Sequence, residues 1–461
     1  MKFHISNTTI AKVAKRGVKS AAAGLIGKLV VAATSPGGAK GPLDFYDQPE
    51  YAANVLDSMG IALLNRDRRE LGIQMIQRAF DLRIKFFGPN HPSTAQSLHS
   101  YTRVLRERGE YVKAEATAKD ALRINTAIFG KNSYPVAISS YELSLVQLAA
   151  GRPADGEKNA SAGYRILEAL KLTDSDFYST RLLDVQARAQ TDLGNFAAAD
   201  ATFKALLAID AKQLGTKHPK YVTHQANYAG LKAAQGDINT AKKYLLQAIA
   251  VYVGVLKLPK HINLIDIYSS LGALLRQRKA NSAELKEAGK YLLLALQLDE
   301  SFRGKDHELV ANDHANLGRW AYDSKDRKSA LASFSRSIAI YAKNVKLNRL
   351  SSDHPFVAEA NTWKGRLLVE AGAVEGGKQA EPLLEAAVAS WPVNLGAGTI
   401  GEGIAKACLG RALFIQSKDL GRARQLLNEA YAILNDRAGG PHPFAKQVAQ
   451  WLQEIGRASA A

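Results

Sequence analysis

Residues 88–122 read GPNHPSTAQSLHSYTRVLRERGEYVKAEATAKDAL, and this stretch decides the fold class. Pro92 can begin a helix, because a residue in the first helical turn needs no intrahelical partner for its N–H. Gly109 marks the point where that helix ends and the chain reverses. Ala114 and Ala121 are seven residues apart, so they lie on one face of a second helix, where small side chains let a neighbour pack closely. The stretch therefore predicts a helix, a short turn and a second helix.

The seven-residue spacing of the second helix recurs along the chain. Nine such pairs, almost all of small residues, follow one another at intervals of 42 to 50 residues, and Leu206 is the one large member. The pairs are Gly72/Ala79, Ala114/Ala121, Gly156/Gly163, Ala199/Leu206, Ala241/Ala248, Ala288/Ala295, Ala330/Ser337, Ala380/Ala387 and Ala423/Ala430. A period of this length is typical of arrays of helical repeats. In the longer intervals we expect the extra residues, near 279–285, 344–351 and 374–378, to lengthen turns.

Histidine followed by proline marks the boundaries between the repeats. The dipeptides are His91-Pro92, His218-Pro219, His354-Pro355 and His442-Pro443, and His261 and His307 stand at equivalent places without the proline. Side chains that are one repeat apart along a solenoid cannot converge on one ion. We therefore expect these histidines to mark helix starts and not to ligate a metal.

These signals resemble the tetratricopeptide repeat of kinesin light chains, which combines a Gly-Pro-Asx-His-Pro linker with a Gly-x-Tyr-x-x-Ala-Glu turn. The matching residues are Gly88-Pro89-Asn90-His91-Pro92, Leu98, Gly109-Glu110-Tyr111, Ala114-Glu115 and Ala121-Leu122. The resemblance covers roughly residues 50–440. It implies an all-α fold, an alpha-alpha superhelix (solenoid) of about nine tetratricopeptide-like helix pairs with a C-terminal capping helix.

The period divides the chain into three segments. Residues 1–43 contain seven basic residues and no acidic one, and we interpret them as a basic N-terminal tail or targeting segment. Residues 44–440 hold the tetratricopeptide-like repeat array. Residues 441–461 form a C-terminal capping helix and tail, in which Trp451 packs inward to cover the apolar face of the last repeat.

Three interpretations of the N-terminal segment stay open. Residues 21–33 (AAAGLIGKLVVAA) have the length of a signal-peptide core, but Lys28 interrupts them. The segment is a disordered or amphipathic tail, a membrane-surface anchor through residues 1–34, or an atypical export signal. An unbroken apolar run of about 18 residues, which a transmembrane helix would need, does not occur. We expect a cytoplasmic protein, with membrane association or export as the alternatives.

No arrangement of residues in the sequence predicts catalysis. The string GxGxxG at 396–401 matches a dinucleotide-binding fingerprint, but no strand precedes it. The string GAVEGGK at 372–378 is followed by Gln379, where a phosphate-binding loop needs a hydroxyl to hold magnesium. Cys408, the single cysteine, lies among alanines and is expected in a helix seam. We expect a protein that is not an enzyme and binds no cofactor or metal.

The net charge of +18 favours an acidic partner, such as an acidic peptide, nucleic acid or anionic lipid, and the alternative is that the charge serves solubility alone or reflects a generally basic proteome. We call the first helix of each repeat helix A and the second helix B, and we number repeat positions so that the first small residue of helix B is position 20. If helices A line the concave wall of the array, the side chains that face inward lie at positions 2, 5, 9 and 12. Arginine recurs at position 9, and its guanidinium binds carboxylates in a bidentate manner, while asparagine can hydrogen-bond an extended backbone. The expected peptide-binding residues are Gln96, His99, Arg103, Arg106, Arg188, Asn227, Asn312, Asn316, Arg319 and Arg366. Apolar side chains of the third repeat, Ile138, Tyr141, Leu145 and Leu148, would supply a hydrophobic pocket.

The sequence thus predicts a non-catalytic protein-protein interaction scaffold whose groove binds an acidic or extended peptide. In the alternative interpretation of the groove, its arginines pair with Asp184, Asp266 and Glu359 on adjacent repeats. Alternative functions are a basic adaptor that binds nucleic acid or a membrane surface, and an accessory or regulatory subunit of an enzyme or secretion complex. Nucleic acid is less favoured, because it usually needs a broad basic face with interleaved aromatic residues.

Overall fold

The computed structural model describes residues 49–64, 69–173, 176–277, 282–347, 349–435 and 441–458. Within these ranges every regular element is a helix and no strand occurs. The chain divides into two compact units, unit 1 (Met1–Tyr101) and unit 2 (Thr102–Ala461). The basic segment 1–43 lies outside the described residues. None of the described helices is both long enough and apolar enough to cross a membrane.

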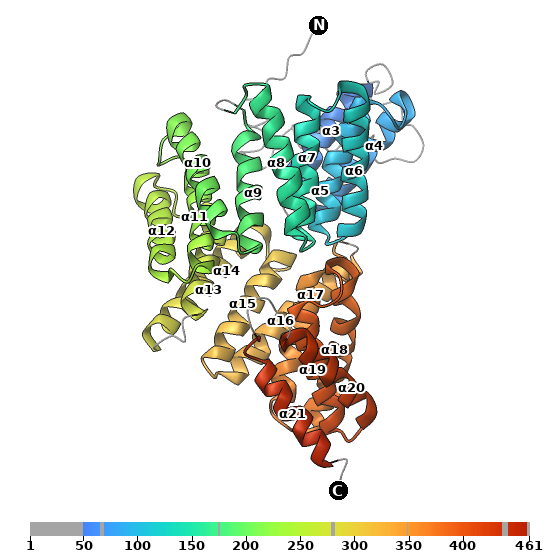
Figure 1. The fold of residues 1–461 in the computed structure, drawn as a ribbon, viewed down its shortest axis with the longest axis vertical. Coiled ribbons are helices and arrows are strands. Elements are labelled where there is room, and N and C mark those ends of the chain that lie inside the picture. The colour runs from blue at the N-terminus through green and yellow to red at the C-terminus, as the bar shows by residue number, and fades with distance from the viewer. Residues whose placement is uncertain are drawn as a thin grey trace, which may run out of the picture. The chain divides into compact units, whose positions relative to one another are not determined.

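The described helices form consecutive pairs, in which we name the first helix A and the second helix B (Figure 1). Helices A are α3 (Pro49–Leu64), α5 (Pro92–Glu107), α7 (Tyr134–Ala149), α9 (Ser179–Asp192), α11 (Pro219–Ala234), α13 (Asn263–Gln277), α15 (Glu308–Asp323), α17 (Pro355–Val369) and α19 (Ile400–Ile415). Helices B are α4 (Arg69–Phe87), α6 (Tyr111–Phe129), α8 (Pro153–Ala169), α10 (Phe196–Leu214), α12 (Ile238–Ala250), α14 (Ser282–Arg303), α16 (Arg327–Lys346), α18 (Val374–Leu395) and α20 (Leu420–Asn435). The prediction of about nine helix pairs is confirmed in the described part of the chain.

The residue pairs spaced by seven all lie on helices B, and all of them are buried. Gly163 shows why small side chains are needed there. A methyl group at this position would lie 2.9 Å from Leu182 Cδ2 and 3.2 Å from the carbonyl oxygen of Ala137. Helices A of two successive pairs therefore approach the backbone of helix B closely, and a larger side chain would push them apart.

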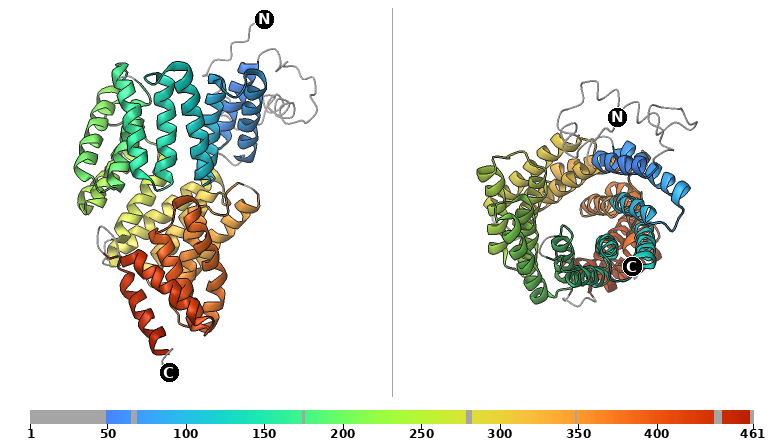
Figure 2. Two further views of the ribbon diagram at one scale, coloured as in Figure 1. Left: turned by 45° about the vertical axis from the view of Figure 1, so that its right-hand side comes forward. Right: turned by 90° about the horizontal axis from the view of Figure 1, so that it is seen from above.

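Unit 2 bends towards its helices A. Each helix A from α7 to α17 packs against the helix A of the following pair, while no two successive helices B in the described residues make contacts as extensive. The pairs are thus closer together on the helix-A side than on the helix-B side (Figure 2). Such a stack places helices A on the concave side of unit 2.

The boundary histidines cap the helices that follow them. In His218, His307 and His354 the ring nitrogen Nδ1 accepts a hydrogen bond from the backbone N–H two residues later, at 3.1 to 3.2 Å. The first N–H groups of a helix have no intrahelical acceptor, so this contact satisfies one of them. The same contact is made by His91, His261 and His442. Helix capping thus explains why histidine recurs at six of the repeat boundaries.

The longer repeats gain helix as well as loop, which corrects the expectation that all insertions lengthen turns. Residues 374–378 begin α18, and both α14 and α18 contain 22 residues. Ala373 has extended backbone before α18 and Glu375 lies in its first turn, where the helix dipole favours a carboxylate. A second irregularity is a short π-helix, η1 (Val251–Val255), that continues α12. Sequence periodicity does not separate an added helical turn from an added loop.

The loop before α17 contacts the turn between α5 and α6, and both belong to unit 2. The backbone N–H of Ser351 donates a hydrogen bond to the carbonyl oxygen of Arg108 at 3.1 Å. The ring centroids of His354 and Tyr111 are 6.5 Å apart. Gly109 lies beneath His354 with φ of +75°, and a methyl group there would be 2.3 Å from His354 Cδ2. We call this meeting of residues 108–111 with 351–354 the loop contact.

A single helix, α21 (Ala445–Ala458), follows the last pair. Val448, Trp451 and Ile455 of this helix, together with Phe444 just before it, are buried in one cluster with residues of α19 and α20. The edge-to-face packing of Phe444 on Trp451, with centroids 5.5 Å apart, fixes the start of the helix. The prediction of a capping helix with an inward Trp451 is confirmed.

Candidate functional site

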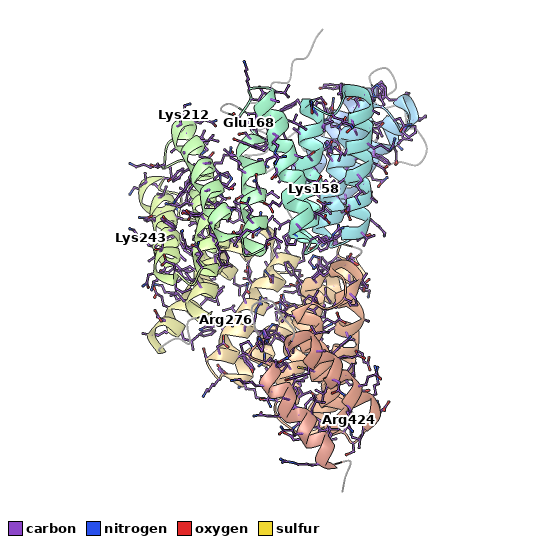
Figure 3. The ribbon with its side chains drawn as sticks, viewed as in Figure 1. Lys158, Glu168, Lys212, Lys243, Arg276 and Arg424 are labelled. Carbon is purple, nitrogen blue, oxygen red and sulfur yellow. The ribbon has the colours of Figure 1, made fainter. Side chains whose placement is uncertain are left out.

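Partly exposed side chains on helices A of unit 2 form a stripe, which we call the helix-A face. Eight of the ten residues expected in a peptide groove lie on it: Arg103, Arg106, Arg188, Asn227, Asn312, Asn316, Arg319 and Arg366. The other two, Gln96 and His99, belong to unit 1. The strongly charged side chains labelled in Figure 3, such as Lys158 and Lys243, come mostly from helices B.

Repeat position 5 differs from the sequence-based expectation. Tyr141, Asp184 and Thr362 occupy this position, and all three are buried. In contrast, Arg181 and Glu359 at position 2, and the position-9 arginines, are partly or fully exposed. Tyr141 and Asp184 contact Tyr178 and Asn227 of the following pair, whereas Thr362 accepts a hydrogen bond from Trp391 of α18. The exposed stripe is therefore narrower than helical spacing alone suggests. Positions 2, 6 and 9 therefore make up most of the helix-A face.

Arg188 and Asn227 meet at one carboxylate. The side chain of Asn227 donates a hydrogen bond from Nδ2 to Asp184 Oδ1 at 2.7 Å, across neighbouring repeats. Arg188 Nη1 is 3.5 Å from the other oxygen of Asp184, yet the Arg188 side chain remains 47% exposed. Asp184 thus orients both side chains while about half of the Arg188 side chain stays exposed.

Arg319 joins the seventh and eighth pairs. Its Nη1 donates to Glu359, and its Nη2 donates to Asn316 Oδ1 at 2.7 Å. The side chain of Asn312, one turn before Asn316, makes no hydrogen bond with any described residue. The alternative interpretation is therefore right about Glu359, which pairs with Arg319 of the adjacent repeat. Asp184 pairs with Arg188 of its own helix, four residues away, and not with an arginine of an adjacent repeat. Asp266 instead lies near Arg303, and burial raises the pKa of its carboxyl while Arg303 opposes that shift.

Three arginines surround one glutamate on α5, α7 and α9. Burial raises the pKa of Glu142, and the positive charges of Arg106, Arg103 and Arg181 act against that rise. Arg103 Nε donates to Glu107 at 2.8 Å. Arg181 lies 3.9 Å above the ring of Phe177 and donates to the hydroxyl of Tyr141 at 3.3 Å. This part of the helix-A face thus brings three arginines and two glutamates together. Of the expected hydrophobic pocket residues, Ile138, Leu145 and Leu148 are partly exposed beside it.

In unit 1, Gln96 is exposed and its Nε2 lies 3.4 Å from Asn54 Oδ1. Burial lowers the pKa of His99 to about 4, so its ring is neutral at physiological pH. A neutral imidazole cannot attract an acidic ligand by charge.

The sequence strings that resemble catalytic motifs lie in helical surroundings. The GxGxxG string at 396–401 joins α18 to α19, so it lacks the strand that a dinucleotide site requires. Cys408 is fully buried in α19, and burial raises the pKa of its thiol to about 12. A neutral thiol without solvent access is a poor nucleophile.

A cavity of about 620 Å³ lies between α15, α17, α19 and α21, at the end of the helix-A face. It is lined by Tyr322, Arg366, Val369, Glu370, Gly372, Arg411, His442, Pro443, Phe444, Gln447, Trp451 and Glu454. Only Arg366 was among the expected site residues. The others were missed because they come from four elements whose mutual register no sequence spacing reveals.

The guanidinium of Arg366 is held by two hydrogen bonds. Its Nε donates to Glu370 at 2.7 Å and its Nη2 donates to the hydroxyl of Tyr322 at 3.0 Å. The hydroxyl of Tyr322 in turn donates to Glu370 at 2.8 Å. Burial, with the Glu370 carboxylate, raises the pKa of Tyr322 to about 12. The tyrosine therefore stays protonated and keeps donating.

Comparisons with known proteins match segments of the helix pairs described above. The family model for the tetratricopeptide repeat matches residues 51–127 and 280–343, which hold α3 to α6 and α14 to α16. A putative kinesin light chain from Podosopora anserina with nearly identical TPR-like repeats is 19% identical, covers 47% of this chain and 99% of its own, and has a TM-score of 0.37. BtubC (BKLC) from P. vanneervenii is 17% identical over 58% of this chain and 89% of its own, with a TM-score of 0.37. The Rap protein complexed with competence and sporulation factor is 14% identical over 79% of this chain and 98% of its own, with a TM-score of 0.41.

Proposed function

We propose that this chain, which is a tetratricopeptide repeat protein, is a non-catalytic scaffold that binds an extended acidic segment of a protein partner along the helix-A face of unit 2. The observation that carries this proposal is the set of partly exposed arginine and asparagine side chains on α5, α9, α11, α15 and α17. Residues 44–440 would hold the array, residues 441–461 would close its end, and residues 1–43 would target the protein.

The ion pairs on the helix-A face are weak enough to be exchanged. A partly exposed ion pair contributes only about 0–1 kcal/mol to stability, since water solvates the separated charges well. The Arg188 side chain is 47% exposed, and the Glu359 side chain beside Arg319 is 28% exposed. A peptide carboxylate can therefore bind the exposed side of Arg188 while Asp184 stays in place, or replace Glu359 at Arg319, and the asparagine amides can bond to its backbone.

A second candidate is the binding of an anionic polymer to helices B. Helix α16 carries five basic residues and no acidic one. However, Asp306 pairs with two of them, Arg336 at 3.3 Å and Lys343 at 2.5 Å. This candidate predicts that substitutions on helices B weaken binding and that affinity falls steeply with salt.

The test is fluorescence anisotropy with the full chain and a fluorescein-labelled octapeptide of alternating aspartate and serine. Its matched control is the same peptide with asparagine for aspartate. We expect the double variant Arg188→Ala/Arg319→Ala to bind the acidic peptide about tenfold or more weakly, since each charge-assisted hydrogen bond is worth more than about 1 kcal/mol.

A matched control variant removes the same number of positive charges from helices B instead of helices A. Lys158→Ala/Lys243→Ala removes two exposed cations from α8 and α12 (Figure 3). We expect this variant to bind like the native chain. Equal affinity of the Arg188/Arg319 variant and the native chain would refute binding at the helix-A face. Loss of binding in the Lys158/Lys243 variant would favour the second candidate.

A further inference from the structure

We infer that the cavity beside α21 is an anchoring pocket for a peptide that presents a carboxylate side chain next to an aromatic one. This inference rests on the proposed function and names the part of the peptide that fixes its position. The cavity adjoins the helix-A face through Tyr322, Arg366 and Glu370, and α21 closes it at the end of the array. A peptide that lies along the helix-A face therefore has this pocket at one end of its path.

Two guanidinium groups line the pocket, and aromatic rings hold both. Arg366 lies 4.3 Å above the ring of Phe444 and 5.2 Å above that of Tyr322. Arg411 lies 5.3 Å from the ring of Phe414 and 5.5 Å from that of Trp451. Rings in this position immobilise a guanidinium and exclude water from one of its faces. The remaining N–H groups then point in fixed directions, which reduces the entropy lost when a ligand binds.

Both arginines keep N–H donors that no described residue accepts. Arg366 uses Nε and Nη2 for Glu370 and Tyr322, and its Nη1 bonds to no described residue. Arg411 uses Nη1 for Glu454, and its Nε and Nη2 bond to no described residue. These donors suit a ligand carboxylate, which can accept several hydrogen bonds at once.

The two carboxylates of the pocket differ in how firmly they are held. Glu370 accepts from both Arg366 and Tyr322, so a ligand would have to break two hydrogen bonds to displace it. Glu454 has only Arg411 as a partner among the described residues, and its side chain is 44% exposed. A ligand carboxylate would therefore displace Glu454 from Arg411 and leave Glu370 in place.

The size and the walls of the pocket indicate which peptide side chain fits beside the ligand carboxylate. A volume of about 620 Å³ exceeds what one side chain fills and lies in the range of small-ligand sites. Val369, Phe444 and Trp451 supply apolar surface beside the arginines. A flat aromatic side chain makes the largest contact with such walls, because offset and edge-on ring pairs add to hydrophobic burial. The carboxylate and the ring therefore have to be adjacent in the peptide.

The test uses the full chain and a labelled, C-terminally amidated octapeptide that contains a Glu-Phe pair in a Gly/Ser background. Matched probes replace Glu with Gln or Phe with Ala. We expect each replacement to weaken binding about tenfold, because each removes one of the two anchoring interactions. Equal affinity for the three peptides would overturn the inference.

Protein variants make the test specific to this pocket. Arg411→Gln should weaken Glu-Phe binding about tenfold, since it removes the guanidinium that the ligand carboxylate would bind. Glu454→Gln should instead tighten binding about threefold, because the competing carboxylate is gone. Arg424→Gln, at an exposed position on α20, is the matched control and should have no effect (Figure 3). Far-ultraviolet circular dichroism of each variant checks that it is folded.

The variants also separate this inference from the proposed function. If Arg411→Gln and Glu454→Gln change the affinity in opposite directions while Arg188→Ala/Arg319→Ala has no effect, the pocket is a binding site and the proposed groove is wrong. If only the groove variants weaken binding, the peptide lies elsewhere on the helix-A face and the pocket inference is wrong. An unchanged affinity in Glu454→Gln also contradicts the displacement of Glu454.

Discussion

The backbone N–H of Ser351 donates a hydrogen bond at 3.1 Å to the carbonyl oxygen of Arg108, so the eighth helix pair contacts the second. Most contacts in a helical array link neighbouring repeats only. Here the contact comes from the loop that lengthens the interval before α17. The inserted residues thus connect two distant parts of unit 2, and Gly109 and His354 complete the loop contact.

Gly109→Ala should destabilise unit 2 by about 2 kcal/mol or more, as the methyl group would overlap His354 and φ would stay positive. The free energy of unfolding from urea titration measures this effect. Hydrogen exchange at the amide of Ser351 should become faster in the same variant, since the loop contact would open.

Gly194→Ala provides the control for backbone strain. Gly194 has φ of +77°, and a methyl group added there would meet nothing within 4 Å. Only the strain of a positive φ in a residue with a Cβ would therefore destabilise this variant. This variant should lose about 1 kcal/mol. An equal loss in the two variants would mean that the close approach of His354 to Gly109 contributes nothing to stability.

Asp313 should make unit 2 less stable as the pH rises. Burial, and then the neighbouring carboxylate of Asp299, raise the pKa of Asp313 to about 8. The folded chain therefore keeps a proton that the unfolded chain releases near its ordinary pKa of 3.8. The stability contributed by this group is complete below a pH of about 4, declines between about pH 4 and about pH 8, and is lost above the folded-state pKa.

Asp313→Asn tests this dependence. The amide is neutral at every pH and can keep a hydrogen bond with Ser269, whose hydroxyl lies 3.3 Å from Asp313 Oδ1. Thermal unfolding should show a melting temperature that is higher in the variant than in the native chain at about pH 8. The difference should shrink at about pH 5, and a difference that does not depend on pH would show that Asp313 does not carry the buried proton.

His218 should stabilise α11 as a helix cap. Its Nδ1 accepts from the backbone N–H of Lys220 at 3.1 Å, and its side chain is exposed, so packing contributes little. His218→Ala should lower the free energy of unfolding by about 1 kcal/mol, whereas His218→Asn should retain most of it, because asparagine is also a good cap. Equal free energies of unfolding for His218→Ala and His218→Asn would show that the capping hydrogen bond does not stabilise α11.

The helix pairs could be predicted because their signals are local. Small residues seven apart identify helices B, and a glycine or His-Pro marks many of the turns, so Ala114, Gly109 and His91 define one repeat without reference to any other. The direction of Trp451 was predictable for a related reason, because the last apolar face of an array has to be covered.

The candidate site could be predicted only in part. Helical spacing placed Arg188 and Arg319 on the exposed face, but it also placed position 5 there, and Asp184 is buried because the adjacent helix A covers it. The pocket of Arg366 and Arg411 depends on how α21 packs against α15 and α17. The loop contact likewise depends on the curvature accumulated over five intervening pairs, which no single repeat encodes.

The loop contact has a mechanical consequence. An open solenoid extends under tension by small rotations at each interface between pairs, and its length then grows smoothly with force. In unit 2 the five pairs from α7 to α16 are joined at their two ends by residues 108–111 and 351–354. Tension applied across this segment would load the loop contact first, so extension would begin with one abrupt rupture before the array behaves as a spring.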